Sequence, residues 1–347
     1  MKKIFKAGWV ILALGAVLAI VGAAFNGVKA VEFNGFKVQT VKKDTAITKT
    51  YAKKEFECIE FVNGSGYFVP MELEIKQGQD YSVSYSGSSR FEPKIDYQNG
   101  TLKVARGQEM HGFSFDLNNY RSKIDSKLII TVPENVKLSF VKVNGNYNNI
   151  KLEKLNIATL ELEANSSEKL SLNEVTTERT DIDMNTDEVT LTNSKLNNGE
   201  LSLVADLVVS GGELTNINVK VDSEGRVYYK DGLVLNGGGT QLADEVYGYE
   251  SDDDNDADND SDYADNSELN AELDADTITI KGKYEIKNNT GVTRIMNATV
   301  QGYRLTNKHG KNNLHDQQQT NGGTLEENAD QADVLTLSSR TGENTVK

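Results

Sequence analysis

Hydrophobic and polar residues alternate in short runs between residues 149 and 225, and the runs recur at a nearly constant interval. Four successive segments of 18 to 20 residues each start with one alternating run, pass through a polar corner and end with a second run. Alternation with a period of two predicts half-buried β-strands. Repetition at this interval is typical of a stacked β-coil, so the pattern predicts an all-β, solenoid-like fold. The segments are residues 149–168, 169–187, 188–205 and 206–225.

Two sets of hydrophobic pairs are expected to stack from turn to turn, because each strand buries alternate residues. The first set is Leu160/Leu162, Ile182/Met184, Leu201/Leu203 and Val219/Val221. The second set is Ile150/Leu152, Leu170/Leu172, Val189/Leu191 and Leu207/Val209. Asparagine tolerates left-handed backbone at corners. We therefore expect Asn165 to stack with Asn185, and Asn173 with Asn193.

Short β-hairpins are predicted before the coil. Alternating runs at 71–75 and 81–85 flank a turn, and Asn99-Gly100 is a strong hairpin signal between two further runs. After residue 225 the alternation weakens, returns at 277–286, and gives way to an Asn- and Gln-rich stretch at 306–333. We expect that stretch to be a polar loop, with a last strand at 334–337.

The N-terminus carries a membrane signal. Lys2, Lys3 and Lys6 precede Ala7–Phe25, which has 19 uncharged residues. As a helix this segment would span roughly 28 Å, close to the hydrocarbon thickness of a bilayer. The positive-inside rule predicts a cytoplasmic N-terminus and an extracellular remainder. A cleaved signal peptide is the alternative, with Gly22 and Ala24, or Val28 and Ala30, available to the peptidase.

The net charge of −15 is confined to one segment. Residues 244–276 hold 15 Asp and Glu and no Lys or Arg, and the rest of the chain carries 37 residues of each sign. This balance gives no extended basic surface for nucleic acid. Self-repelling acidic tracts favour disorder, so we expect a loop. The alternating aspartates that begin at Asp252 do not fit an EF-hand, because Ala257 and Tyr263 stand where its glycine and glutamate are required.

The predicted organisation is therefore an N-terminal anchor followed by an interrupted β region. Its parts are a membrane anchor at 1–28, a juxtamembrane tether at 29–54, a β-hairpin and solenoid domain at 55–243, the acidic loop at 244–276, and further strands with a polar loop at 277–347.

Candidate chemistry is sparse. Acidic residues lie on the predicted strands, and two carboxylates about 5 to 9.5 Å apart are what a glycosidase needs, although outward charges usually form a solvated face. The histidines are far apart in sequence and lack the spacing of metal ligands. Cys58 alternates with Phe56 and is expected to pack as a small buried residue. The residues considered are Glu161, Asp181, Asp183, Glu200, His111, His309, His315, Tyr81, Tyr85, Tyr97 and Tyr120.

The order of these signals resembles a known bacterial group. It runs from F-x-x-I at Phe56–Ile59 through M-x-L-x-I and Y-x-V-x-Y to Asn99-Gly100 and the strand ending in Val132-Pro133. It is similar to the "putative adhesin" β-strand-repeat proteins of the Gram-positive cell envelope. The resemblance covers about residues 55–225. It implies surface binding or a role in envelope stress, and it brings no catalytic residues.

These observations favour a membrane-anchored extracellular protein that binds or senses at the bacterial cell envelope without catalysis. The chain predicts no catalytic, cofactor-binding or metal-binding residue. Besides the membrane, the expected partners are an envelope protein, a wall polymer or a cationic peptide. A carbohydrate-active β-helix enzyme and a purely structural surface spacer are the alternatives.

Overall fold

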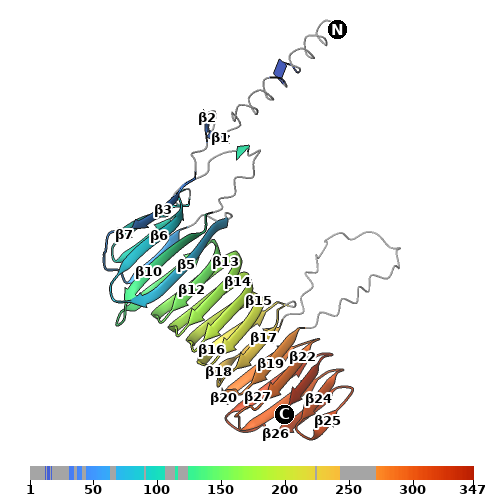
Figure 1. The fold of residues 1–347 in the computed structure, drawn as a ribbon. Coiled ribbons are helices and arrows are strands. Elements are labelled where there is room, and N and C mark those ends of the chain that lie inside the picture. The colour runs from blue at the N-terminus through green and yellow to red at the C-terminus, as the bar shows by residue number, and fades with distance from the viewer. Residues whose placement is uncertain are drawn as a thin grey trace, which may run out of the picture.

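The computed structural model is an elongated stack of β-strands (Figure 1). It describes residues 12, 14–15, 17, 31–34, 37–40, 44–62, 68–89, 91–105, 114–115, 124–222, 225–242 and 271–347. Most strands pair in parallel with the strand one turn away, so the chain winds as a coil with two main walls. The prediction of an all-β fold is confirmed.

Wall A is built by one strand from each turn. From the N-terminal end, its strands are β7 (Lys94–Gln98), β8 (Thr101–Ala105), β4 (Cys58–Val62), β11 (Lys137–Asn144), the first halves of β13 (Asn156–Asn173), β14 (Thr176–Thr192) and β15 (Lys195–Ser210), then β16 (Glu213–Val221), β18 (Val234–Leu242), β21 (Lys283–Asn288), β27 (Val334–Ser339), β23 (Gly302–Asn307) and β26 (Gly323–Glu327).

Wall B runs beside it and uses the other strand of each turn. Its strands are β3 (Ala46–Thr50), β6 (Ser82–Ser88), β10 (Ser126–Pro133), β5 (Phe68–Gly78), β12 (Asn146–Glu153), the second halves of β13, β14 and β15, then β17 (Val227–Lys230), β19 (Glu272–Asp276), β22 (Val292–Met296), β28 (Glu343–Val346), β24 (Lys311–Leu314) and β25 (Gln317–Gln319). Three further strands are β1 (Val31–Asn34), β2 (Lys37–Thr40) and β9 (Ser114–Phe115), and β20 (Thr279–Lys281) pairs with the start of β18.

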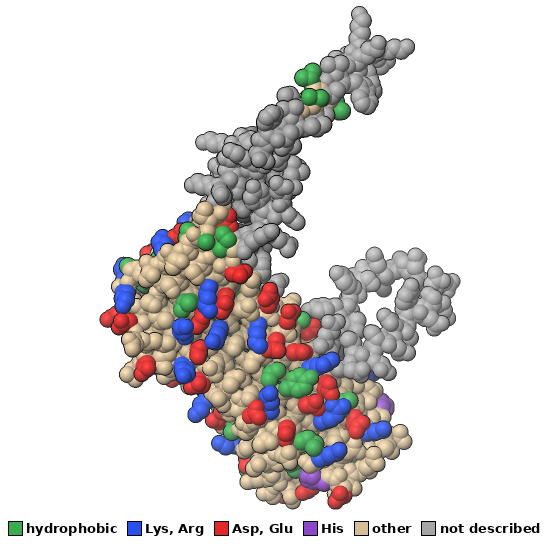
Figure 2. All heavy atoms as spheres, in the orientation of Figure 1, with side chains coloured by type: hydrophobic (Ala, Val, Ile, Leu, Met, Phe, Trp, Pro, Cys, Tyr) green, Lys and Arg blue, Asp and Glu red, His purple; other side chains and the backbone are tan. Residues whose placement is uncertain are grey.

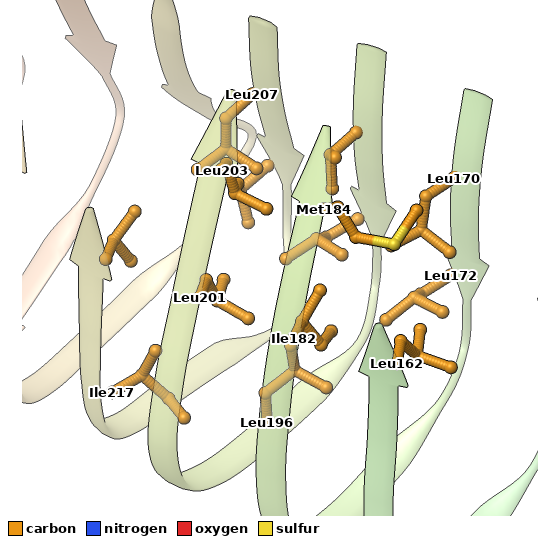
Figure 3. Packing of buried hydrophobic residues seen from close by; sticks show 14 of the residues in the cluster. Leu162, Leu170, Leu172, Ile182, Met184, Leu196, Leu201, Leu203, Leu207 and Ile217 are labelled. Atoms are coloured by element: carbon orange, nitrogen blue, oxygen red, sulfur yellow. The ribbon is translucent and has the colours of Figure 1, made fainter. Parts of the chain in front are cut away.

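The core is a continuous hydrophobic column between the walls. Leucine, isoleucine and valine side chains from successive turns point inward and contact the turns above and below (Figure 3). The second predicted set of pairs is confirmed along its whole length, from Ile150 opposite Leu170 to Leu191 opposite Val209. Each isolated turn leaves half of this surface open, so the turns must stabilise one another.

In the first predicted set, the register between the first and second turns is wrong by two residues. Leu162, and not Leu160, pairs with Ile182, whereas the later steps follow the prediction. Leu160 lies opposite Thr180, which is buried and bonded to the Thr177 hydroxyl at 2.6 Å. A buried threonine in an inward position concealed the register from a search for hydrophobic pairs.

The corners also shift one prediction. Asn165 pairs with Asn185 in the backbone register, as expected. Asn193 was expected to stack with Asn173, but it occupies the same corner position as Glu174. Both Asn193 and Glu174 have a left-handed backbone, with φ of 47° and 53°, and the backbone N–H of each donates to a carbonyl on the next turn. The corner position therefore accepts residues other than asparagine.

A small polar group interrupts the core between walls A and B. The hydroxyl of Thr240 lies 2.8 Å from that of Tyr229 and 2.7 Å from that of Tyr284. Burial raises the pKa of Tyr284 to about 12 and raises that of Tyr229 as well. All three groups thus stay neutral and satisfy one another, which removes the cost of burying them.

Most of the acidic tract lies outside the described residues, namely residues 243–270. The last part of the predicted loop at 244–276 is corrected, because Glu272–Asp276 form strand β19. Leu273 and Ala275 are buried, and Leu273 pairs with Val227 of β17. The coil therefore resumes before residue 277, in parallel register with the turn that precedes the tract.

The prediction that the Asn- and Gln-rich stretch at 306–333 is a loop is wrong. It forms β24, β25 and β26, which close the end of the coil as antiparallel pairs. Its inward positions are partly taken by asparagine: the amide of Asn312 donates to the carbonyls of Leu305 and Gly323. Asn344 donates to Asn312 at 2.9 Å. Hydrogen-bonded amides thus replace hydrophobic side chains at buried positions.

The final strands are placed out of sequence order. β27 lies between β21 and β23, and β28 lies between β22 and β24. The strand predicted at 334–337 is therefore confirmed, but it forms an internal rung.

The N-terminal predictions are only partly covered. The anchor predicted at Ala7–Phe25 lies outside the described residues except for Leu12, Leu14, Gly15 and Val17. No helix within the described part of the chain is long and apolar enough to cross a membrane. The tether predicted at 29–54 contains β1, β2 and β3, and β3 pairs with β6, so the coil begins before residue 55.

The buried amides yield a testable prediction. We expect Asn312→Leu to lower the free energy of unfolding by about 2–3 kcal/mol, because two carbonyls and the Asn344 amide lose a partner in the interior. The exposed Gln318→Leu on the neighbouring strand should change it by less than about 0.5 kcal/mol. Denaturant unfolding followed by circular dichroism measures both. Equal stability of the two variants would contradict the structural role of Asn312.

Candidate binding face

The four carboxylates singled out in the sequence lie together on the outer side of wall A. Glu161 pairs with Asp181, which pairs with Glu200, so the three lie in one row across β13, β14 and β15. Asp183 lies in the next outward row, where Glu163 is its partner. These five residues, with Lys142 of β11, are called the acidic face. Parallel, in-register stacking is what brings them together.

The acidic face surrounds a shallow hollow of about 300 Å³. Neighbouring strands lie about 4.8 Å apart, and alternate residues of one strand lie about 6.7 Å apart. The carboxylates therefore form a regular grid. The hollow is lined by Lys142, Val143, Glu161, Leu162, Glu163, Asp181 and Asp183.

Only part of this negative charge is matched. Lys142 Nζ lies 3.0 Å from Glu161, and this hydrogen bond and charge raise the pKa of Lys142. Lys220 Nζ lies 2.8 Å from Glu200. Asp181 and Asp183 are exposed, and neither makes a hydrogen bond or ion pair within the residues that the structure describes. The centre of the face thus has a surplus of negative charge.

Wall B differs in this respect, because several of its carboxylates are engaged by cations. Buried Glu74 lies 2.6 Å from both Lys127 and Lys76; burial opposes its ionisation, but these partners lower its pKa overall. Arg294 contacts both Glu272 and Asp274. Figure 2 shows acidic and basic side chains interspersed on the side of the molecule in view.

The hollow continues along wall A as a second depression of about 240 Å³. Its floor is open where Gly239 occupies an outward position between Asn218 and Glu285. Two ion pairs, Lys220 with Glu200 and Lys287 with Glu285, border it. The sequence analysis missed this part of the surface, although three consecutive glycines at 237–239 were its signal.

The acidic face is an open, charged surface. The spacing of the grid is compatible with a pair of glycosidase carboxylates, so distance alone does not decide. Asp181 and Asp183 are exposed to solvent and are not enclosed in an apolar site. No group of three or more His, Cys, Asp or Glu among the described residues is placed to hold a metal ion.

The other candidates do not assemble into a site. His315 Nδ1 lies 3.0 Å from Glu327 and its ring packs edge-on against Tyr303, whereas His309 lies at a corner turn. Tyr81 packs against Phe56, the Tyr85 hydroxyl donates to the Ser88 carbonyl, and the Tyr97 hydroxyl donates to the Ala52 carbonyl. His111 and Tyr120 lie outside the described residues.

The expectation that Cys58 is buried is wrong. Cys58 is only half-buried, because Ile59 and Phe61 take the inward positions of β4. Phe56 is buried, but it precedes the strand and so does not set its phase.

Comparison with known proteins agrees with the coil. Residues 69–231 match the family model described as Toastrack DUF4097. The resemblance predicted from the sequence is thereby confirmed for this part of the chain, while the link to Gram-positive envelopes stays a prediction. No curated protein matches the sequence.

Several solved structures are similar over most of the chain. A "putative adhesin" of Parabacteroides distasonis is 12% identical, with 87% of this chain and 97% of that chain covered and a TM-score of 0.48. A "putative adhesin" of Bacteroides fragilis has the same identity and coverage and a TM-score of 0.37. A "putative lipid binding protein" of Parabacteroides distasonis is also 12% identical, with the same coverage and a TM-score of 0.34.

The surplus charge predicts a stability effect. We expect the double variant Asp181→Asn/Asp183→Asn to raise the melting temperature by about 1–3 °C at low salt, because it removes repulsion between exposed carboxylates. The gain should largely vanish in about 1 M NaCl, where the screening length is short. Differential scanning calorimetry at both salt concentrations tests this. A loss of stability would mean that these carboxylates have stabilising partners.

Proposed function

We propose that this protein is a non-catalytic binding module of the bacterial cell envelope that holds extended, positively charged ligands on its acidic face. The observation that carries the proposal is a pair of exposed carboxylates on the acidic face, Asp181 and Asp183, neither of which has an ion-pair partner among the described residues. A cationic ligand that binds here would not have to displace an existing ion pair. It would therefore gain the full attraction of the Asp181 and Asp183 carboxylates.

The regular spacing favours an extended ligand over a compact one. Rows along wall A repeat at the strand spacing of about 4.8 Å. A chain that carries amines at intervals can contact several rungs at once, and each added contact is then intramolecular. The coil itself is held by backbone hydrogen bonds at every rung, so little conformational entropy is lost when a ligand binds.

The exposure of the carboxylates supports a role without catalysis. Both carboxylates are open to solvent and to a passing ligand, which suits electrostatic capture. A wide, shallow hollow also fails to exclude water from a reacting bond. Surface presentation is therefore the mechanism we propose.

The location at the envelope rests on the N-terminal segment. Three lysines followed by 19 uncharged residues support a single-pass anchor with its N-terminus in the cytoplasm. In that arrangement the whole coil is extracellular, and Figure 1 shows β3 and the C-terminus at opposite ends of it.

Binding to the acidic face can be measured with a fluorescent decalysine peptide and the full-length protein. We expect Asp181→Lys/Asp183→Lys to weaken binding at least about tenfold at low ionic strength, since the variant reverses the charge at the centre of the face. The wild-type affinity should fall steeply as salt rises to about 0.15 M. Fluorescence anisotropy gives both results.

The matched control is Glu168→Lys/Asp187→Lys, which makes the same change in net charge at two exposed carboxylates outside the acidic face. It should bind decalysine nearly as well as the wild-type protein. Equal losses in the two variants would show that only net charge matters, and no binding by the wild-type protein would refute the proposed ligand.

The anchor is tested separately in cells. We expect the protein to remain with membranes after alkaline extraction, and protease added to intact cells to remove the coil but spare an N-terminal tag. Replacing Leu14 and Val17 with aspartate should release the protein, because two charges in the apolar segment oppose insertion. A mature N-terminus that begins after Ala24 or Ala30 would instead establish a cleaved signal peptide.

A further inference from the structure

Four glycines stack at one corner near the C-terminal end of the coil. Gly291, Gly342 and Gly310 follow one another on successive turns, and the carbonyl of each accepts a hydrogen bond from the next turn. Gly322 closes the row by donating to the Gly310 carbonyl at 3.1 Å. A Cβ at Gly291, Gly342 or Gly310 would lie 1.7 to 2.0 Å from a backbone oxygen. This corner must therefore be made of bare backbone.

Asparagine side chains fix the shape of the corner. The amide of Asn307 donates to the Gly342 carbonyl at 2.7 Å, and its oxygen accepts the backbone N–H of His309 and Gly310. Asn288 has the same role two rungs away: its amide donates to the Ala271 carbonyl and its oxygen accepts the backbone N–H of Gly291. Both asparagines are buried. The corner is thus rigid before any ligand arrives.

The missing side chains leave a hollow of about 410 Å³. Three of the stacked glycines, Gly291, Gly342 and Gly310, form its floor, which is about 10 Å long at the usual strand spacing. Thr290, Thr341 and His309 form one flank, and Val292, Glu343 and Lys311 form the other; Thr320 and Asn321 close one end.

Basic groups without partners gather around this hollow. His309, Lys311, Lys308 and Arg340 are exposed, and none has a side-chain ion pair among the residues that the structure describes. Glu343, the acidic residue of the flank, accepts hydrogen bonds from the Asn313 amide and the Thr345 hydroxyl on its own wall. Nearby Arg294 and Arg304, by contrast, are both paired with carboxylates.

We propose that this glycine corner is a second binding site, which takes a phosphate-bearing chain of sugar or polyol units. The unpaired basic side chains would bind the anionic phosphates. Threonine hydroxyls and the Asn321 amide provide for the hydroxyl groups, and the glycine floor admits a chain close to the backbone. The site is opposite in charge to the acidic face and independent of it.

The proposal is tested with a fluorescein-labelled oligomer of glycerol phosphate and the full-length protein. We expect measurable binding by fluorescence anisotropy, competition by unlabelled oligomer, and no competition by neutral dextran. His309→Ala/Lys311→Ala should weaken binding at least about tenfold. Both residues are exposed and carry no described side-chain contact that holds the fold, so the melting temperature should stay unchanged.

Two controls make the result decisive. Lys195→Ala/Lys230→Ala removes two exposed lysines elsewhere on the coil and should leave binding unchanged. Asp181→Asn/Asp183→Asn should leave it undiminished, which separates this site from the acidic face. Wild-type affinity in His309→Ala/Lys311→Ala, or an equal loss in the Lys195 and Lys230 variant, would overturn the proposal. Displacement by dextran sulfate as efficient as by glycerol phosphate would also overturn it, because it would reduce the site to a general polyanion attraction.

Discussion

Parallel, in-register pairing between successive turns is the constraint on which the rest of this structure depends. Each turn satisfies its backbone hydrogen bonds with the turns on either side, so the same position recurs at every rung. Inward positions must then form one continuous core, and outward positions must form rows. The acidic face and the glycine corner are both such rows. Neither belongs to a single loop. Both form because stacking brings together residues of the same type from equivalent positions of successive turns.

The same constraint explains where unusual residues are tolerated. A buried polar group is acceptable when the next rung supplies its partner, as Thr240 does for Tyr229 and Tyr284, and as Asn344 does for Asn312. A corner accepts only glycine where the neighbouring carbonyl leaves no room for a Cβ, as at Gly342. The two binding sites proposed on this scaffold therefore use side chains that stacking does not require, such as Asp181 and Lys311.

Much of the coil could be predicted from the sequence, because Leu172, Leu191 and Val209 alternate with polar residues in a visible period. What could not be predicted was polar burial. Thr180 concealed the register of Leu160, and polar residues such as Asn307 and Asn312 led to the prediction of a loop where β24, β25 and β26 form. The acidic residues were identified singly, but their meeting on one face needed the register. The glycine corner needed the out-of-order insertion of β27 and β28, which no local pattern encodes.

The central claim is that one coil continues in register across the acidic tract. Spin labels at Ser171 and Arg294, in a Cys58→Ser background, test it directly by pulsed electron paramagnetic resonance. These positions lie in one outward row of wall B, five rungs apart through Thr190, Val208, Tyr228 and Asp274. We predict a narrow distribution near about 24 Å between the two backbones, broadened by the label arms. A broad distribution centred well beyond that distance would show that the segment after the tract folds apart from the coil.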